Sequence, residues 1–284
     1  MNGTKSSPFE SLRANGSRVD CFRKRMTFEV IDTHAHLDDM QDLGAAIERA
    51  RESGVIAIVA VGIDYESNNR VLEIAEKFPG LVLPAFGMHP QDIGDSSEIE
   101  RNLRFIEDHV RESVAIGEVG LDYHKKALGR ASKDVQKQVL RDTLEIAKRF
   151  GKPASVHSRY SWRDSLEAVA ESGVDRAVFH WYTGPMNVLR DCFERGYSAS
   201  ATLATEYHEE HRRAIKETPW DRLMLETDSP VVYRWGTEFA HPSEPADTAR
   251  VVLEAVARLR EVEPAFVARK TTENARRFFG LAKG

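Results

Sequence analysis

The stretch Val55-Ile-Ala-Ile-Val-Ala-Val61 is a short run rich in β-branched residues, and it lies between two segments of helical periodicity, residues 41–53 and 67–78. Gly54 separates the first of these segments from the run, and glycine commonly ends a helix. A β-rich run flanked by helical segments is the pattern of a βαβ unit, in which a helix joins two parallel strands. This stretch therefore predicts an α/β fold.

The same alternation repeats along the chain. The β-rich runs predicted as strands are Phe28–Asp32, Val55–Val61, Leu81–Gly87, Val114–Glu118, Ala154–His157, Ala177–His180, Tyr197–Ala201 and Leu223–Thr227. The predicted helices are Gln41–Ser53, Ser67–Phe78, Ser96–Glu112, Asp134–Phe150, Trp162–Ser172, Met186–Arg195, His208–Glu217, Asp247–Glu261 and, as an additional C-terminal helix, Glu263–Phe279. This order predicts a single (β/α)8 TIM barrel. The alternative, an open doubly wound sheet, would need a glycine-rich phosphate loop, and neither GxGxxG nor GxxxxGK[ST] occurs.

Composition supports one globular domain preceded by a tail. The chain has 284 residues, of which 41% are hydrophobic and 30% are charged, so a full core is available. We expect residues 26–284 to form the barrel domain. Residues 1–25 are rich in Ser, Asn, Gly, Arg and Lys without an apolar period, which is typical of a disordered tail. Met26, directly before the first strand, is either the true start or an ordinary internal methionine.

Other features of the chain favour a cytoplasmic protein. No run approaches 18 apolar residues and the first eight residues lack an apolar segment, so we expect neither a membrane span nor a secretory signal. Cys21 and Cys192 are far apart, which argues against a disulfide scaffold or cysteine-ligated zinc; Cys192 is expected on the buried face of a helix. The net charge of −5 argues against a protein that coats polyanions, but not against a nuclease whose bound metal ions supply positive charge.

Side chains that can bind metal ions fall at the ends of the predicted strands. They are His34 and His36 after the first strand, His89 after the third, Glu118, His157 and His180 at the ends of the fourth to sixth, and Asp228 after the eighth. In a barrel, all these ends lie on the face that carries the active site. Any one of them alone is as well explained by packing, a surface ion pair or a turn cap. Together they predict a metal site.

The size of the set points to more than one ion. Imidazoles and carboxylates suit zinc, manganese or magnesium. Even four of these five histidines with the two carboxylates exceed what one tetrahedral ion with an open position needs, whereas a carboxylate bridging two ions about 4 Å apart would use the surplus. Two such ions stabilise both the attacking and the leaving oxygen of a displacement at phosphorus.

The remaining histidines give weaker signals. His208 and His211 are spaced i, i+3 on a predicted helix, but the run His-Glu-Glu-His is not the HExxH zinc motif, and we expect a solvated helix face. His241 lies in the loop after the last strand. It is either a residue of the pocket wall or a loop residue without a role in the site.

Several motifs resemble one known family. They are Ile31-Asp-Thr-His-Ala-His-Leu-Asp, Gly87-Met-His-Pro, Ala115-Ile-Gly-Glu-Val-Gly-Leu-Asp-Tyr, Val156-His-Ser-Arg, His180-Trp-Tyr-Thr-Gly and Leu225-Glu-Thr-Asp-Ser-Pro. In this order they resemble the TatD-like metal-dependent hydrolases, a branch of the amidohydrolase-type barrels that includes the TatD-type deoxyribonucleases. The resemblance spans residues 28–280.

The resemblance implies two divalent metal ions per subunit, zinc, magnesium or manganese. It places His34, His36 and Asp228 on one ion, His157 and His180 on the other, and Glu118 on both. It also implies that His89 faces the scissile phosphate. Arg159 would then reach a phosphate bidentately, with a salt bridge at the rim as the alternative.

Three positions depart from the family pattern. Tyr160 stands where an acidic residue is usual, Trp181-Tyr-Thr replaces the common Cys-Phe-Ser, and Ser243 replaces the asparagine of Asn-Glu-Pro. These departures spare the expected ligands but alter the pocket walls, so they affect the substrate rather than the metal site.

The leading hypothesis is a 3′→5′ exonuclease-like deoxyribonuclease, with DNA or another nucleic acid as its partner and no obligate protein partner. Asp228 would orient or deprotonate the attacking water, while His89 and Arg159 would steady the phosphate charge. Trp181, Tyr182 and Trp235 are candidates to stack a terminal base. The alternative is an esterase of the same barrel, such as a D-aminoacyl-tRNA deacylase. A non-enzymatic scaffold would predict the loss of a ligand, and none is lost.

Overall fold

The structure, a computed structural model, describes residues 28–235 and 238–282. Eight parallel strands form one sheet in sequential order. They are β1 (Val30–Ala35), β2 (Val55–Val61), β3 (Val82–Met88), β4 (Ala115–Asp122), β5 (Ala154–Arg159), β6 (Ala177–Phe179), β7 (Ser198–Ala201) and β8 (Leu223–Leu225). The ends of β8 and β1 meet, since the Asp228 amide donates to the His34 carbonyl at 2.9 Å and the His36 amide to the Ser229 carbonyl at 2.8 Å. The predicted (β/α)8 barrel is therefore confirmed.

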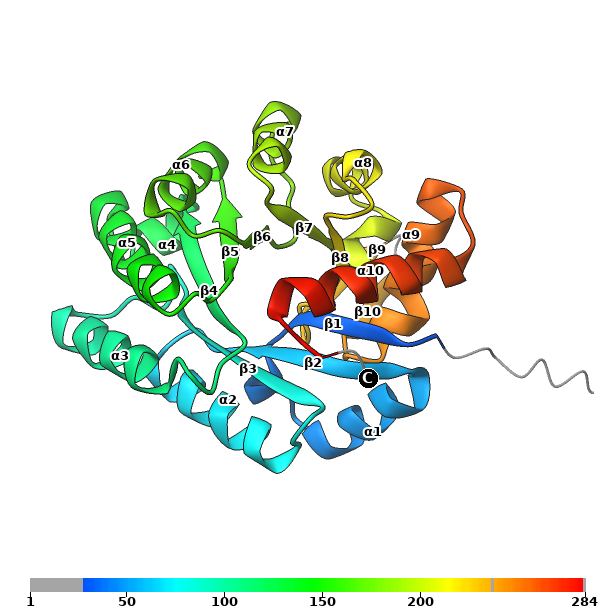
Figure 1. Ribbon diagram of the computed structural model, residues 1–284, viewed down its shortest axis with the longest axis horizontal. Helices are drawn as coiled ribbons and strands as arrows, with labels where there is room; N and C mark the ends of the chain where they lie inside the picture. Colours follow the sequence, from blue (N-terminus) through cyan, green and yellow to red (C-terminus); the bar gives the residue numbers. More distant parts are fainter. Residues whose placement is uncertain (1–27, 236–237, 283–284) are drawn as a thin grey trace, which may run out of the picture.

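Helices surround the strands in the order that the sequence predicts (Figure 1). They are α1 (Leu43–Ser53), α2 (Tyr65–Lys77), α3 (Ser96–His109), α5 (Lys133–Arg149), α6 (Trp162–Ser172), α7 (Met186–Glu194), α8 (Glu209–Glu217) and α9 (Leu253–Arg260). Cys192 is buried on α7, as expected. None of the helices in residues 28–235 and 238–282 is both long and apolar enough to cross a membrane.

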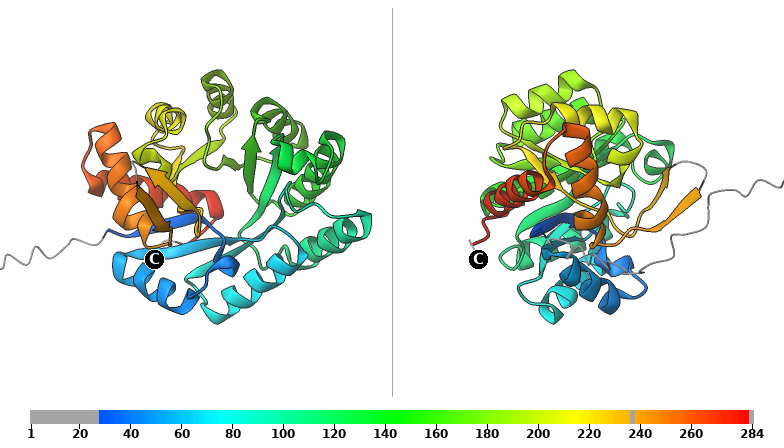
Figure 2. Two further views of the ribbon diagram at one scale, coloured as in Figure 1. Left: turned by 180° about the vertical axis from the view of Figure 1, so that it is seen from behind. Right: turned by 90° about the vertical axis from the view of Figure 1, so that its right-hand side faces the viewer.

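The additional C-terminal helix, α10 (Pro264–Phe279), closes the amino-terminal end of the barrel (Figures 1 and 2). Its Phe278 and Phe279 pack on the inward-facing residues Val59 and Met224. Asn274 donates to the backbone carbonyls of Trp220 and Leu223, at the start of β8. Because this end is filled by apolar side chains, the opposite end, where the strands finish, is the one available for a site.

Several short elements were not predicted. A four-residue helix, α4 (Lys125–Leu128), follows β4, and an antiparallel hairpin of β9 (Val232–Trp235) and β10 (Glu238–Pro242) follows β8. Short helical turns η1 (Leu37–Asp39) and η2 (Leu203–Glu206) follow β1 and β7, and the predicted helix at residues 247–261 begins as a wider π turn, η3 (Thr248–Val252). Each is too short to give a periodic signal. The predicted tail at residues 1–25, which includes Cys21, lies outside the described residues. Met26, which follows the tail, lies outside them as well.

Two glycines of this barrel differ sharply in the space around them. Gly87 in β3 faces β4, where a Cβ would lie 2.3 Å from the backbone oxygen of Glu118 and 2.5 Å from its nitrogen. The Gly87 backbone is also held by Asn68, which accepts from its amide and donates to its carbonyl. By contrast, a Cβ on Gly44 in α1 would meet no atom within 4 Å. Only the first position requires glycine.

We therefore expect opposite effects from two alanine substitutions. Gly87→Ala should lower the free energy of unfolding by about 1–3 kcal/mol, the usual cost of overpacking, because β4 must move at Glu118. Gly44→Ala should raise it by about 0.5–1 kcal/mol, because alanine favours a helix. Urea denaturation of both variants measures the difference, and equal stabilities would contradict the close packing of β3 on β4.

Candidate metal centre

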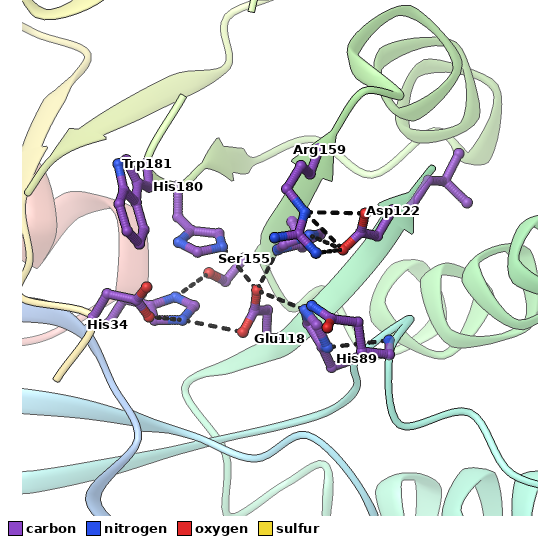
Figure 3. Close-up of polar contacts among 12 residues, drawn as sticks. His34, His89, Glu118, Asp122, Ser155, Arg159, His180 and Trp181 are labelled. Atoms are coloured by element: carbon purple, nitrogen blue, oxygen red, sulfur yellow. Dashed lines mark hydrogen bonds and ion pairs between the residues drawn. The ribbon is translucent and has the colours of Figure 1, made fainter. Parts of the chain in front are cut away.

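The two carboxylate oxygens of Glu118 face different pairs of histidines (Figure 3). Oε2 lies 3.4 Å from Nε2 of His34 and 3.4 Å from Nε2 of His36. Oε1 lies 2.8 Å from Nδ1 of His157 and 2.8 Å from Nε2 of His180. The side chain of Glu118 is buried at the centre of the barrel mouth. The carboxylate thus divides the imidazoles into two groups.

Asp228 completes the first of these groups. Its Oδ1 lies 3.2 Å from Nε2 of His36 and 3.5 Å from Nε2 of His34. Three sets of ligand atoms lie within 4.8 Å of one another: His34, His36 and Asp228; His34, Glu118 and His180; and His89, Glu118 and His157. The structure thus brings together all the residues that the sequence proposes as ligands.

His89 lies closer to this centre than the sequence hypothesis places it. Its Nε2 is 3.6 Å from Oε1 of Glu118, and its ring meets that of His157 edge to face at 4.5 Å. Its Nδ1 is 3.2 Å from Oδ2 of Asp92 and 3.2 Å from the amide nitrogen of Gln91. The Gln91 and Asp92 contacts fix the ring with Nε2 toward the ligands. By distance alone, His89 is either a contact for substrate or a further ligand.

The seam between β8 and β1 positions His34 and Asp228. Asp32, fully buried in β1, accepts hydrogen bonds from the backbone and hydroxyl of Thr227 at 3.1 and 2.6 Å and from the amide of His34 at 3.3 Å. Asp228 itself has φ +50°, in the left-handed region. The buried carboxylate of Asp32 thus bonds to the backbone of His34 and to Thr227, the residue before Asp228, and holds this backbone in place. Asp32 stands two residues before the His-x-His pair, but its position in the sequence alone does not indicate this role.

Further polar side chains fix the rings of the histidines. Oγ of Ser155 lies 3.2 Å from Nδ1 of His34, Oε1 of Glu226 lies 3.5 Å from Nδ1 of His180, and Oδ2 of Asp122 lies 3.4 Å from Nε2 of His157. Partners of this kind orient metal-binding histidines and raise their basicity. Glu226 and Asp122 both stand in the quoted family motifs. The motifs alone do not show that these carboxylates lie beside the histidines.

Arg159 is held by Asp122. Its Nε lies 3.1 and 3.0 Å from the two carboxylate oxygens, and its Nη2 lies 2.6 Å from Oδ2. Burial raises the pKa of Asp122, but His157, Arg159 and a backbone amide outweigh this and hold it well below its usual range. The salt bridge that the sequence left as the alternative is therefore present. Arg159 also lines the pocket, so its role toward a phosphate stays a prediction.

The electrostatics of the centre suit divalent cations. Burial opposes charge on Glu118 and Asp228, yet the surrounding histidines hold the pKa of Glu118 well below its usual range and that of Asp228 at about 2. Burial also lowers the pKa of His36 and His180, but neighbouring carboxylates raise both well above their usual value. Nε2 of His34 is buried without a hydrogen-bond partner. Ionised carboxylates and unpartnered imidazole nitrogens are the donors that divalent ions take.

A cavity of about 710 Å³ opens above these residues. Its walls include Tyr160, Trp162 and Trp181. The prediction that Tyr182 stacks a base is wrong, because this side chain is fully buried and its hydroxyl donates to the Pro185 carbonyl at 2.8 Å. The predictions for Trp235 and His241 lie outside the described side chains.

The expected solvated helix face is wrong for His211. His211 is fully buried, its Nε2 lies 3.1 Å from the Thr202 amide nitrogen, and its Nδ1 lies 3.0 Å from the Tyr182 carbonyl oxygen. The ring therefore joins the ends of β6 and β7 behind the pocket wall. His208 caps α8 and lines the cavity. Helical spacing alone does not reveal which face of α8 packs on the barrel.

Comparison with known proteins gives one consistent result. The family model described as TatD related DNase matches residues 31–280. An uncharacterized metal-dependent hydrolase, YabD of Bacillus subtilis, is 34% identical over 89% of this chain and 99% of its own length. Human deoxyribonuclease TATDN3 is 29% identical over 88% of this chain and 94% of its own. The crystal structure of YJJV, a TatD homologue from Escherichia coli, superposes with a TM-score of 0.80 at 26% identity, covering 90% of this chain and 100% of that one.

The burial of His211 predicts a pH-dependent stability. Burial is the main cause that lowers the pKa of His211 to about 4, whereas the unfolded chain has about 6.5. Protonation therefore favours unfolding, so stability present above pH 6.5 is lost as the pH falls toward 4. Between pH 7.5 and 4.5 the loss from this residue should be about 2–3 kcal/mol. Urea denaturation of wild type and His211→Gln at both pH values measures it, and an identical pH dependence in the two proteins would contradict the assignment.

Proposed function

This chain belongs to the TatD-related DNase family of metal-dependent hydrolases, and we propose that it is a deoxyribonuclease that uses two divalent ions to cleave phosphodiester bonds, in the manner of a 3′→5′ exonuclease. Relatives named as deoxyribonucleases support DNA as the substrate. Zinc, magnesium and manganese all suit the donor set.

The observation that carries the proposal is the division of the Glu118 oxygens between two groups of imidazoles. A carboxylate with one oxygen directed at each group is suited to bridge two ions. His34, His36 and Asp228 would hold one ion with Glu118, and His157 and His180 would hold the other. When bound, such a pair supplies an activated water and neutralises charge on the phosphoryl oxygens.

The residues around the ligands would complete the reaction. Asp228 is ionised at neutral pH, because the neighbouring imidazoles hold its pKa at about 2 against the effect of burial. It can therefore accept a hydrogen bond from the attacking water and orient it. Burial lowers the pKa of His89, which keeps this ring neutral, and its Nε2 is directed toward the ligands. Arg159, already fixed on Asp122, lies in the wall that the phosphate would meet.

We expect chelation to abolish hydrolysis of single-stranded DNA and a divalent ion to restore it. The reason is that the ligand atoms by themselves offer no strong nucleophile or electrophile. The assay compares the dialysed enzyme in excess chelator with the same enzyme supplied with Zn²⁺, Mn²⁺ or Mg²⁺, on a terminal phosphodiester and on an aminoacyl ester. Full activity in chelator would end the metal mechanism, and hydrolysis of the ester alone would assign the protein to the esterase alternative.

We also expect His89→Ala to keep its metal while losing at least about 10²-fold in kcat, the usual effect of removing one transition-state contact. Metal content measured on the purified variant separates the two roles that the distances allow. If the variant lost a stoichiometric ion, His89 would be a ligand and not a substrate contact.

A further inference from the structure

One wall of the metal pocket carries an aromatic side chain that points into solvent. Tyr160 lines the cavity and is 60% exposed, the highest value among the exposed large apolar side chains in the described part of the chain. A single exposed aromatic side chain needs no explanation by itself, but this one stands on the pocket wall, where a ligand in the pocket would meet it. The residue follows β5 directly, so it stands three positions after His157 and next to Arg159.

The backbone of Tyr160 is fixed on both sides. Arg159 before it is paired with Asp122, and its carbonyl accepts from the Tyr123 amide at 2.8 Å. Ser161 after it donates from Oγ to the Leu121 carbonyl at 2.5 Å. These anchors on β4 and the loop after it hold Tyr160 at φ +58°, a left-handed conformation that a bulky residue adopts only when its surroundings enforce it. The anchored backbone therefore sets the direction of the Tyr160 side chain.

Neighbouring rings limit how the side chain can turn. Trp162 meets Tyr160 nearly at right angles, with centroids 5.8 Å apart, and the ring of His124 lies 6.2 Å away at 24°. Trp162 is itself packed against Gly184, where a Cβ would lie 2.4 Å from its Cγ. Tyr160 is therefore an exposed ring with two neighbouring rings beside it, and a flat group can stack on such a ring.

We propose that Tyr160, supported by Trp162, is a stacking platform for the nucleobase beside the cleaved phosphodiester, and that it makes the enzyme prefer DNA ends that carry a base. The proposal rests on the proposed function. A phosphate at the candidate ligands and Arg159 brings its attached nucleoside to this wall of the pocket. Stacking needs only a π face, so the preference should hold for any base but fail for an abasic sugar.

The test compares two short single-stranded oligonucleotides that differ only at the terminal residue that the enzyme removes, which is a normal nucleotide or an abasic sugar phosphate. With the Mn²⁺-loaded wild type, kcat/KM should favour the base by about 5- to 150-fold, the effect of one stacked base. In Tyr160→Ala this ratio should fall to within about threefold, mostly through KM, because stacking stabilises bound substrate and transition state alike. Tyr160→Trp, which keeps a ring, should preserve the ratio.

A control variant, a substitute variant and a binding measurement accompany this test. Tyr207→Ala removes another exposed tyrosine that does not line the cavity and should keep the wild-type ratio. Tyr160→Asn removes the ring but tolerates a left-handed backbone, so it replaces Tyr160→Ala if that variant folds poorly. Dissociation constants for the same oligonucleotides, measured by fluorescence anisotropy in an Asp228→Asn background, give a readout that does not depend on turnover.

The outcomes separate the two proposals. An unchanged base preference in Tyr160→Ala or Tyr160→Asn, or no preference in wild type, would overturn the stacking platform while leaving the nuclease assignment in place. If wild type cleaved neither oligonucleotide with any of the three ions, the nuclease assignment would fail. In that case the dissociation constants would still show whether Tyr160 binds a base.

Discussion

The buried carboxylate of Glu118 is the group on which the rest of the centre depends. It lies in the middle of β4, 3% exposed, with an oxygen directed to each of two histidine pairs. An isolated buried anion is strongly unfavourable, so this position requires positive charge from protonated imidazoles or from metal ions. Gly87 on β3 approaches the Glu118 backbone so closely that any side chain larger than that of glycine would displace it. The barrel thus fixes the position of the Glu118 carboxylate, and its buried negative charge requires cationic groups around it.

A second layer of polar groups extends this constraint outward. Asp122 accepts hydrogen bonds from Arg159 and lies 3.4 Å from Nε2 of His157, so one carboxylate lies beside both a candidate ligand and a candidate phosphate contact. Glu226 lies beside His180 and accepts from the amide of Trp181 at 3.0 Å, which links the metal centre to an aromatic wall in the same way. The same two carboxylates therefore position both the candidate ligands and the residues of the pocket wall. A substitution in this layer should therefore affect both metal affinity and substrate binding.

Much of the fold and of the centre could be predicted, because strand ends converge in a barrel and the His-x-His pair and Asp228 stand at such ends. Glu118 was expected at the end of its strand as well, but β4 continues past it to Asp122. Residues whose role depends on packing could not. His211 is turned inward by the contact of α8 with the barrel, a contact that helical periodicity does not specify. The burial of Tyr182, whose hydroxyl donates to the Pro185 carbonyl, likewise depends on packing. The pairing of Arg159 with Asp122 joins neighbouring strands through a register that no local pattern reveals.

The central claim is that Glu118 bridges two ions, and metal stoichiometry tests it most directly. Glutamine has the shape of glutamate but cannot supply a charged oxygen to each ion. Elemental analysis of the purified proteins after equilibration with Mn²⁺ or Zn²⁺ should give two ions per chain for wild type and at most one for Glu118→Gln, provided that thermal denaturation shows both to be folded. A single ion in wild type, or two ions held equally well by Glu118→Gln, would contradict the account.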